Sequence, residues 1–210
     1  MKKVFAVIAA LVLAVPSFAQ YSSGGFDLDK ENLYYGVRIG MNGATLSGDI
    51  DGLGTKVGLN IAGIIGLHIS KTAPVFLESG LYYTERGGKK DKISVGYNNI
   101  EIPLLVKYGF KASDGIAVLP FLGPTFSYAI SGKTKQAGVS GIEKVGTFDE
   151  KKAFTGGLKR ANMGFKLGCG AEFNNIYLEG GYQFGITDVC KLDEASIHSN
   201  AFFLNFGVNF

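Results

Sequence analysis

Beyond residue 33 of this 210-residue chain, apolar and polar positions alternate with a period of two. The alternation predicts strands, because successive side chains of a strand point to opposite faces. Eight segments show it, over residues 34–42, 58–69, 75–86, 97–110, 117–131, 161–173, 176–186 and 200–210. An even number of segments, each roughly ten residues long, is typical of an antiparallel barrel that spans the bacterial outer membrane.

The connections between these segments alternate in length. Short ones lie at 70–74, 111–116 and at Asn174 and Asn175, and long ones at 43–57, 87–96, 132–160 and 187–199. In an up-and-down barrel of the outer membrane, short turns face the periplasm and long loops face outside. Asn174 and Asn175 predict a two-residue hairpin turn, because Asn tolerates positive φ.

The placement of the apolar face separates a membrane barrel from a water-soluble one. Ile39, Leu104 and Phe206 belong to the face that would meet lipid, and the charged residues of the segments fall on the other face. A soluble barrel such as a lipocalin has the opposite pattern. Aromatic residues also sort into two rims, which a β-sandwich does not predict. We therefore predict an all-β fold, an eight-stranded antiparallel up-and-down transmembrane β-barrel over residues 34–210.

The N-terminal residues have the layout of a secretory signal peptide. Lys2 and Lys3 precede an apolar run at 4–15, and the small-x-small triplet 17–19 follows, so we expect cleavage before Gln20. The apolar run is too short to cross a bilayer as a helix. We predict a signal peptide at 1–19, a flexible segment at 20–33 and localisation in the bacterial outer membrane.

Several runs of sequence carry a family resemblance. They are the leader end Ser-Phe-Ala-Gln, the run YNNIEIPLLVKYGF with Pro103 inside a strand, the run PFLGPTFSYAI and a last strand ending at Phe210. Together they make the chain similar to the PorT-like outer-membrane β-barrel family, and the resemblance implies an integral outer-membrane protein. In that broader class the last strand, with Phe202, Phe206 and Phe210, looks like the signal read by the barrel-assembly machinery.

Charged residues on the inward face are balanced in sign. The basic ones are Arg38, Arg86, Lys107 and Lys166, and the acidic ones are Glu78, Glu101, Glu172 and Glu179. The lumen of an eight-stranded barrel is wide enough only to be filled by side chains. These charges are therefore expected to pair with one another or with trapped water, in a structural network that leaves no conducting channel.

Glycine accounts for 31 residues, and most glycines inside the predicted strands fall on the inward face. With the turns placed as above, Gly66 lies across from Glu78 and Gly170 across from Glu179. Missing side chains leave room for long charged ones in a narrow lumen. The glycine pattern thus predicts a small plugged barrel rather than an open pore.

The motifs give little support for catalysis. His198 is adjacent to Ser199, but neighbours on a strand point to opposite sides, and His68 is expected to have a structural role. Cys169 and Cys190 have no metal-ligand spacing and are expected to be free thiols. We predict no enzyme activity, cofactor or metal, although a lipid-modifying surface enzyme is an alternative.

Basic residues concentrate in two neighbouring outer loops, at 87–96 and 132–160, whereas the other two outer loops carry more acidic than basic residues. The candidate ligand-binding residues are Lys89, Lys90, Lys92, Lys133, Lys135, Lys144, Lys151, Lys152, Lys159 and Arg160. Such a surface suits lipopolysaccharide or an anionic polymer. The alternative is a solvated, mobile loop whose lysines only maintain solubility.

The partners predicted from these features are outer-membrane lipid and lipopolysaccharide, with the barrel-assembly machinery during biogenesis. Without the leader lysines the chain is nearly neutral, so no nucleic acid partner is expected. The predicted role is structural or interactive. The alternative function is an accessory subunit of an envelope secretion or assembly complex, with an envelope protein as partner.

Overall fold

The computed structural model describes residues 33–48, 53–70, 72–90, 93–113, 115–138, 141–149, 157–191 and 196–210. The predicted signal peptide and nearly all of the segment 20–33 lie outside the described residues. Within the described ranges the strands are β1 Leu33–Gly48, β2 Leu53–His68, β3 Val75–Lys90, β4 Ile93–Tyr108, β5 Phe110–Ser113, β6 Ile116–Gly138, β7 Gly141–Gly146, β8 Ala161–Phe173, β9 Ile176–Gly185 and β10 Ile197–Asn209. No described helix is both long and apolar enough to cross a membrane.

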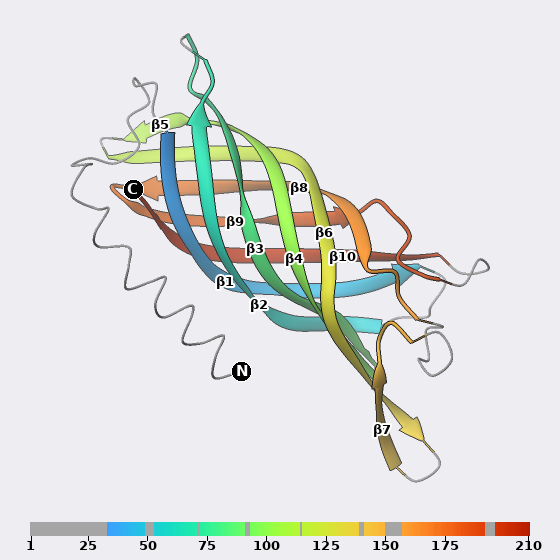
Figure 1. Cartoon of the computed structure of the whole chain (residues 1–210). Helices are drawn as coiled ribbons and strands as arrows, with labels where there is room; N and C mark the ends of the chain where they lie inside the picture. The colour runs from blue at the N-terminus through green and yellow to red at the C-terminus, as the bar shows by residue number, and fades with distance from the viewer. Residues whose placement is uncertain are drawn as a thin grey trace.

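The strands close into one antiparallel barrel (Figure 1). The sheet runs in the order β4-β3-β2-β1-β10-β9-β8-β6, and a direct pairing of β4 with β6 closes it. β5 is a short stretch paired with the start of β6, and β7 folds back on the end of β6 as a hairpin. Eight strands therefore form the wall, which confirms the predicted fold class.

The strands at one end of the barrel continue well past the predicted segments. β1 runs on to Gly48, and β3 and β4 pair as far as Lys90 and Ile93. β6 extends to Gly138 and pairs with β7, so the prediction of an irregular loop from 132 to 160 is wrong over this hairpin. The apolar face ends near the membrane boundary, whereas backbone pairing does not need an apolar face and continues beyond it.

The opposite end carries the short turns. Asn174 has φ of 54°, the only positive value among the described residues other than glycine, and it makes the two-residue turn between β8 and β9 as predicted. β1 begins and β10 ends at this same end (Figure 1). Because short turns of such barrels lie in the periplasm, we name this the periplasmic end and the other the outer end.

The two faces of the wall differ as the alternation predicts. Large apolar side chains on the outside are half exposed, among them Ile39, Met41, Leu104, Phe202 and Phe206. The inside holds a set of buried charged and amide side chains instead. An apolar exterior of this extent requires lipid around the barrel.

Inward glycines make room for aromatic rings as well as for charges. The register pairs Gly66 with Glu78 and Gly170 with Glu179, as predicted. A Cβ at Gly66 would overlap the Tyr34 ring, and one at Gly170 would overlap the Tyr177 hydroxyl. The space therefore holds two tyrosines whose hydroxyl groups reach the buried charges.

Candidate functional site

The periplasmic half of the interior is organised around Glu78. Its carboxylate lies 2.8 Å from Lys107 Nζ and 3.7 Å from Arg38 Nη2, and it accepts a 2.9 Å hydrogen bond from the Tyr34 hydroxyl. Lys107 also donates to Tyr177 Oη at 2.8 Å and lies 3.7 Å from Glu179. The charged side chains of this group are almost fully buried, so each charge depends on its neighbours instead of water.

The half of the interior nearer the outer end is organised around Glu101, which is fully buried. Its carboxylate forms ion pairs with Arg86 Nη2 at 2.7 Å and with Lys166 Nζ at 2.6 Å. Gln183 donates to the same carboxylate at 3.0 Å and to Thr125 at 2.9 Å. Two cations and one amide thus converge on a single acid.

The structure brings seven of the eight predicted interior charges together in these two groups. Glu172 is buried too and accepts a 2.6 Å hydrogen bond from the Asn209 amide. A chain of amides, Asn42 to Asn60 to Asn205, ends on Glu179. The two groups fill much of the interior with paired polar side chains, and this arrangement suits stability better than turnover of a substrate.

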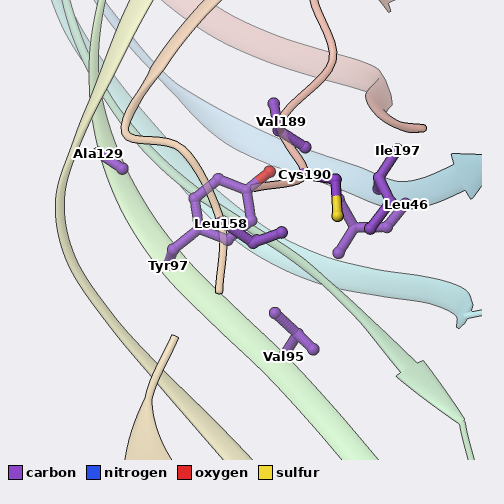
Figure 2. Packing of buried hydrophobic residues seen from close by; sticks show 8 residues of the cluster. All are labelled: Leu46, Val95, Tyr97, Ala129, Leu158, Val189, Cys190 and Ile197. Atoms are coloured by element: carbon purple, nitrogen blue, oxygen red, sulfur yellow. The ribbon is translucent and has the colours of Figure 1, made fainter. Parts of the chain in front are cut away.

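An apolar cap lies over this network at the outer end (Figure 2). It consists of Leu46, Val95, Tyr97, Ala129, Leu158, Val189, Cys190 and Ile197, all buried, with Phe148 packed against them. Leu158 and Cys190 come from two outer loops and form an isolated bridge to each other. Sequence reasoning missed the cap, although apolar residues at 189, 190 and 197 inside a long outer loop were a signal for it.

Asp188 holds one side of the cap in place. Its Oδ1 accepts hydrogen bonds from the backbone N–H groups of Cys190 and Ile197, each at 2.8 Å. Burial opposes ionisation, yet these two N–H groups and Lys159 at 3.6 Å keep the pKa of Asp188 below its usual value. The carboxylate therefore acts as a clamp between the two arms of this loop.

The cap also engages two of the predicted ligand-binding residues. Lys159 forms the ion pair with Asp188. The Arg160 guanidinium lies 4.2 Å from the centre of the Phe148 ring and donates to the Ala129 carbonyl at 2.9 Å. Both side chains therefore interact with other parts of the protein, which leaves them less available to an external anion.

Other predicted basic residues lie elsewhere at the outer end. Lys89 on β3 is exposed, and Lys90 and Lys144 lie on β3 and β7. Lys92, Lys151 and Lys152 lie outside the described residues. Lys133 and Lys135 on β6 meet Ser94 of β4 and Lys56 of β2 around one hollow of about 310 Å³. Lys56 was predicted to belong to a loop of acidic excess, so sequence reasoning did not place it with this group.

The two histidines have structural partners. His68 Nε2 lies 3.1 Å from the Ala73 carbonyl, and the ring stacks on Phe76. His198 Nε2 contacts Ser196 Oγ at 3.2 Å, whereas Ser199 is buried and bonds to Tyr97 Oη at 2.7 Å. As the alternation predicts, His198 and Ser199 point to opposite sides. The described residues contain no group of side chains suited to a metal ion, and Cys169 and Cys190 are not joined by a disulfide.

The last strand completes the wall. Phe202 and Phe206 are half exposed on the outside of β10. The backbone of Phe210 pairs with Tyr35 through hydrogen bonds of 2.7 and 3.2 Å. The seam between the first and last strands is thus fixed at its periplasmic end.

A closed barrel with an apolar exterior and a charged, packed interior defines an integral β-barrel of the bacterial outer membrane. The chain belongs to the family described as Outer membrane protein beta-barrel domain, which matches residues 18–191.

The chain is similar to several solved outer-membrane barrels at low sequence identity. Ail, the attachment invasion locus protein of Yersinia pestis, is 16% identical, with 84% of this chain and 98% of that chain covered and a TM-score of 0.45. Neisserial surface protein A is 17% identical, with 86% and 100% covered and a TM-score of 0.48. A major outer membrane protein from Thermus thermophilus is 13% identical, with 85% and 100% covered and a TM-score of 0.48. No curated protein sequence matches this chain.

Proposed function

We propose that this protein is a plugged outer-membrane barrel that contacts lipopolysaccharide or another anionic surface polymer through basic residues at its outer end. The observation that carries the proposal is the meeting of Lys56, Lys133 and Lys135 around one hollow. The filled interior favours a role at the surface over transport through the lumen. The proposed role is one of binding: His198 Nε2 contacts the Ser196 hydroxyl at 3.2 Å, but His198 Nδ1 has no hydrogen-bond partner among the described residues that would orient the ring as a base.

The experiment compares the full chain with a triple variant, Lys89→Gln, Lys133→Gln and Lys135→Gln, for retention on immobilised lipopolysaccharide. Each lysine near an anionic surface contributes about 1 kcal/mol, so we expect the variant to bind about 100-fold more weakly at low salt. The difference shrinks between about 0.01 M and 0.15 M salt, as the Debye length falls from about 30 to 8 Å. Equal retention of both proteins at low salt would refute the proposal.

A second candidate role is an accessory subunit of an envelope secretion or assembly complex. One observation favours it: β7 pairs with β6 along one edge, and its other edge pairs with no described strand. An open edge can accept a strand from another protein. Isolation in mild detergent of a stoichiometric partner that is lost when Ile142→Pro blocks this edge would support the role, whereas a monomer in both cases would exclude it.

A further inference from the structure

Three lysines from two distant parts of the chain line one hollow at the outer end. Lys133 and Lys135 follow each other on the same face of β6, and the register sets them against Gly96 and Ser94 of β4. Lys56 arrives from β2. The hollow of about 310 Å³ lies at the lower end of the range of about 300–1,000 Å³ found for small-molecule sites.

Gly96 is what allows Lys56 to reach the other two lysines. A Cβ at Gly96 would overlap Lys56 Nζ, while the next nearest group outside that side chain, the Lys133 carbonyl oxygen, lies at 3.7 Å. The backbone at Gly96 does not adopt a left-handed φ, so its conformation does not require glycine. Glycine is needed here because a side chain would take the space of the Lys56 ammonium group. The Lys56 ammonium group occupies the place where any other residue would put its side chain.

The protein balances the charges around the hollow only in part. No carboxylate lines it, and its three lysines have no hydrogen bond or ion pair among the described residues. Burial lowers the pKa of Lys56; the Glu85 carboxylate opposes this effect, and Lys135 adds to it by a smaller amount. The Glu85 carboxylate also accepts a 3.4 Å hydrogen bond from the backbone N–H of Leu59. A bound anion would relieve the repulsion between the ammonium groups.

The hollow lies on the outside of the wall, beyond the lipid-facing band. Val95 and Tyr97 of β4 point into the apolar cap. Ser94 and Gly96, which alternate with them along the strand, therefore face the outside of the wall. On β6, Ile130 is the last large apolar residue of the outer face before Lys133. The level just past the apolar band is that of the phosphorylated headgroups of the outer leaflet.

We propose that Lys56, Lys133, Lys135 and Ser94 form a site for a phosphate monoester on a sugar, with the Lys56 ammonium positioned by Gly96. The ammonium groups bind the phosphate oxygens, and the Ser94 hydroxyl donates a further hydrogen bond. The rest of the hollow accommodates the sugar. This site rests on the proposed function and specifies the chemical group that is bound.

The central experiment moves Lys56 without changing any charge. Gly96→Ala displaces the ammonium group, which is the end of a flexible side chain, so the barrel folds as before. Its control is Gly146→Ala on β7, where a Cβ meets only the Asp149 Cβ at 3.7 Å. A second pair compares Lys56→Gln with Lys111→Gln, which removes the same charge from an exposed position on β5 at the periplasmic end.

Glucose 1-phosphate is titrated into each purified full-length protein in detergent by calorimetry. A hydrogen-bonded charge in a site contributes about 1.5–3 kcal/mol, so we expect Lys56→Gln and Gly96→Ala each to weaken binding about tenfold or more. Gly146→Ala and Lys111→Gln should stay within about threefold of the parent protein. Equal losses in the test and control variants, or no loss in Gly96→Ala, would overturn the site.

Two further arms identify the source of the phosphate. Nanodiscs with lipid A that carries its phosphates are compared with nanodiscs with dephosphorylated lipid A, and competition by glucose 1-phosphate is measured in both. A lipid source predicts weaker binding of the soluble sugar only in the phosphorylated discs, whereas a soluble source predicts the same binding in both. If the triple lysine variant loses lipopolysaccharide but Gly96→Ala binds normally, the proposed function stands and this site falls.

Discussion

At the scale of single residues, the interior depends on a few acids that each serve more than one cation. Glu101 is completely buried and holds both Arg86 and Lys166. Removal of one member of a buried pair strands the charge of its partner, and the cost is larger than the net contribution of the intact pair. Glu101 is therefore the residue whose loss affects the outer half of the network most.

Glu101→Gln is expected to destabilise the barrel by about 3–5 kcal/mol, because it leaves the buried Lys166 ammonium group and the buried Arg86 guanidinium group facing a neutral amide. Urea unfolding in lipid vesicles, followed by the different gel mobility of folded and unfolded barrels, measures the change. The matched control is Glu85→Gln on the outer face, which should alter stability by less than about 1 kcal/mol.

A double variant checks the cause. In Glu101→Gln with Lys166→Met, one of the stranded charges is removed, so the loss of stability should be smaller than the sum of the two single losses. Additive losses would show that Glu101 and Lys166 act independently, and the network would not be the source of the stability.

At the scale of elements, the strands that cross the membrane could be predicted because lipid and lumen impose an alternation on them. The β8 segment agrees with its predicted bounds, Ala161–Phe173, and the turn after it follows from the asparagines. The outer hairpins could not be predicted in this way. β7 pairs with the end of β6 beyond the eight-stranded wall, so the alternation that lipid and lumen impose does not extend to it.

The interior charges could be predicted from the sequence, whereas the outer hollow could not. Arg38 and Glu78 could be assigned to the interior because their strand positions fix the face they occupy. The meeting of Lys56 with Lys133 could not be foreseen, since it depends on a register irregularity of β2 between Thr55 and Asn60. Contacts that depend on an irregular register have no counterpart in a periodic pattern.

The contacts of Asp188 lead to a prediction about the loop between β9 and β10, which forms part of the apolar cap. Asp188→Ala removes the acceptor for two backbone N–H groups, so the loop that carries Cys190 should open more often. In a Cys169→Ser background, modification of Cys190 by a maleimide should become at least about tenfold faster, corresponding to a loss of about 1.4 kcal/mol. Lys159→Gln removes only the half-exposed ion pair and should change the rate little.

The same clamp has a pH dependence with a defined sign. The pKa of Asp188 is lower in the folded protein than its usual value. Its contribution to stability is therefore complete above the ordinary Asp value of about 3.9 and is lost as the pH falls through the lower folded value. Cys190 should become accessible to a pyridyl disulfide reagent in this acid range in the parent protein, while in Asp188→Ala its accessibility should not depend on this step.

At the scale of the whole molecule, two layers close the barrel in different ways. The charged network fills the membrane-spanning part of the lumen, and the apolar cap covers the outer end. Each buried apolar side chain of the cap contributes about 1.5–3 kcal/mol relative to exposure, whereas the network contributes through paired charges. Since the two layers share few residues, loosening one should leave the other in place.

The closed lumen predicts that the purified protein forms no channel. In planar bilayers we expect no conductance steps in the nanosiemens range, because the space inside an eight-stranded barrel is occupied by side chains. A variant with a loosened cap, Leu158→Gln with Val189→Gln, should also be silent, since Glu78 and Glu101 with their cations still fill the lumen below it. Steps in the variant alone would mean that the cap and not the network closes the barrel, and steps in the parent protein would contradict a plugged interior altogether.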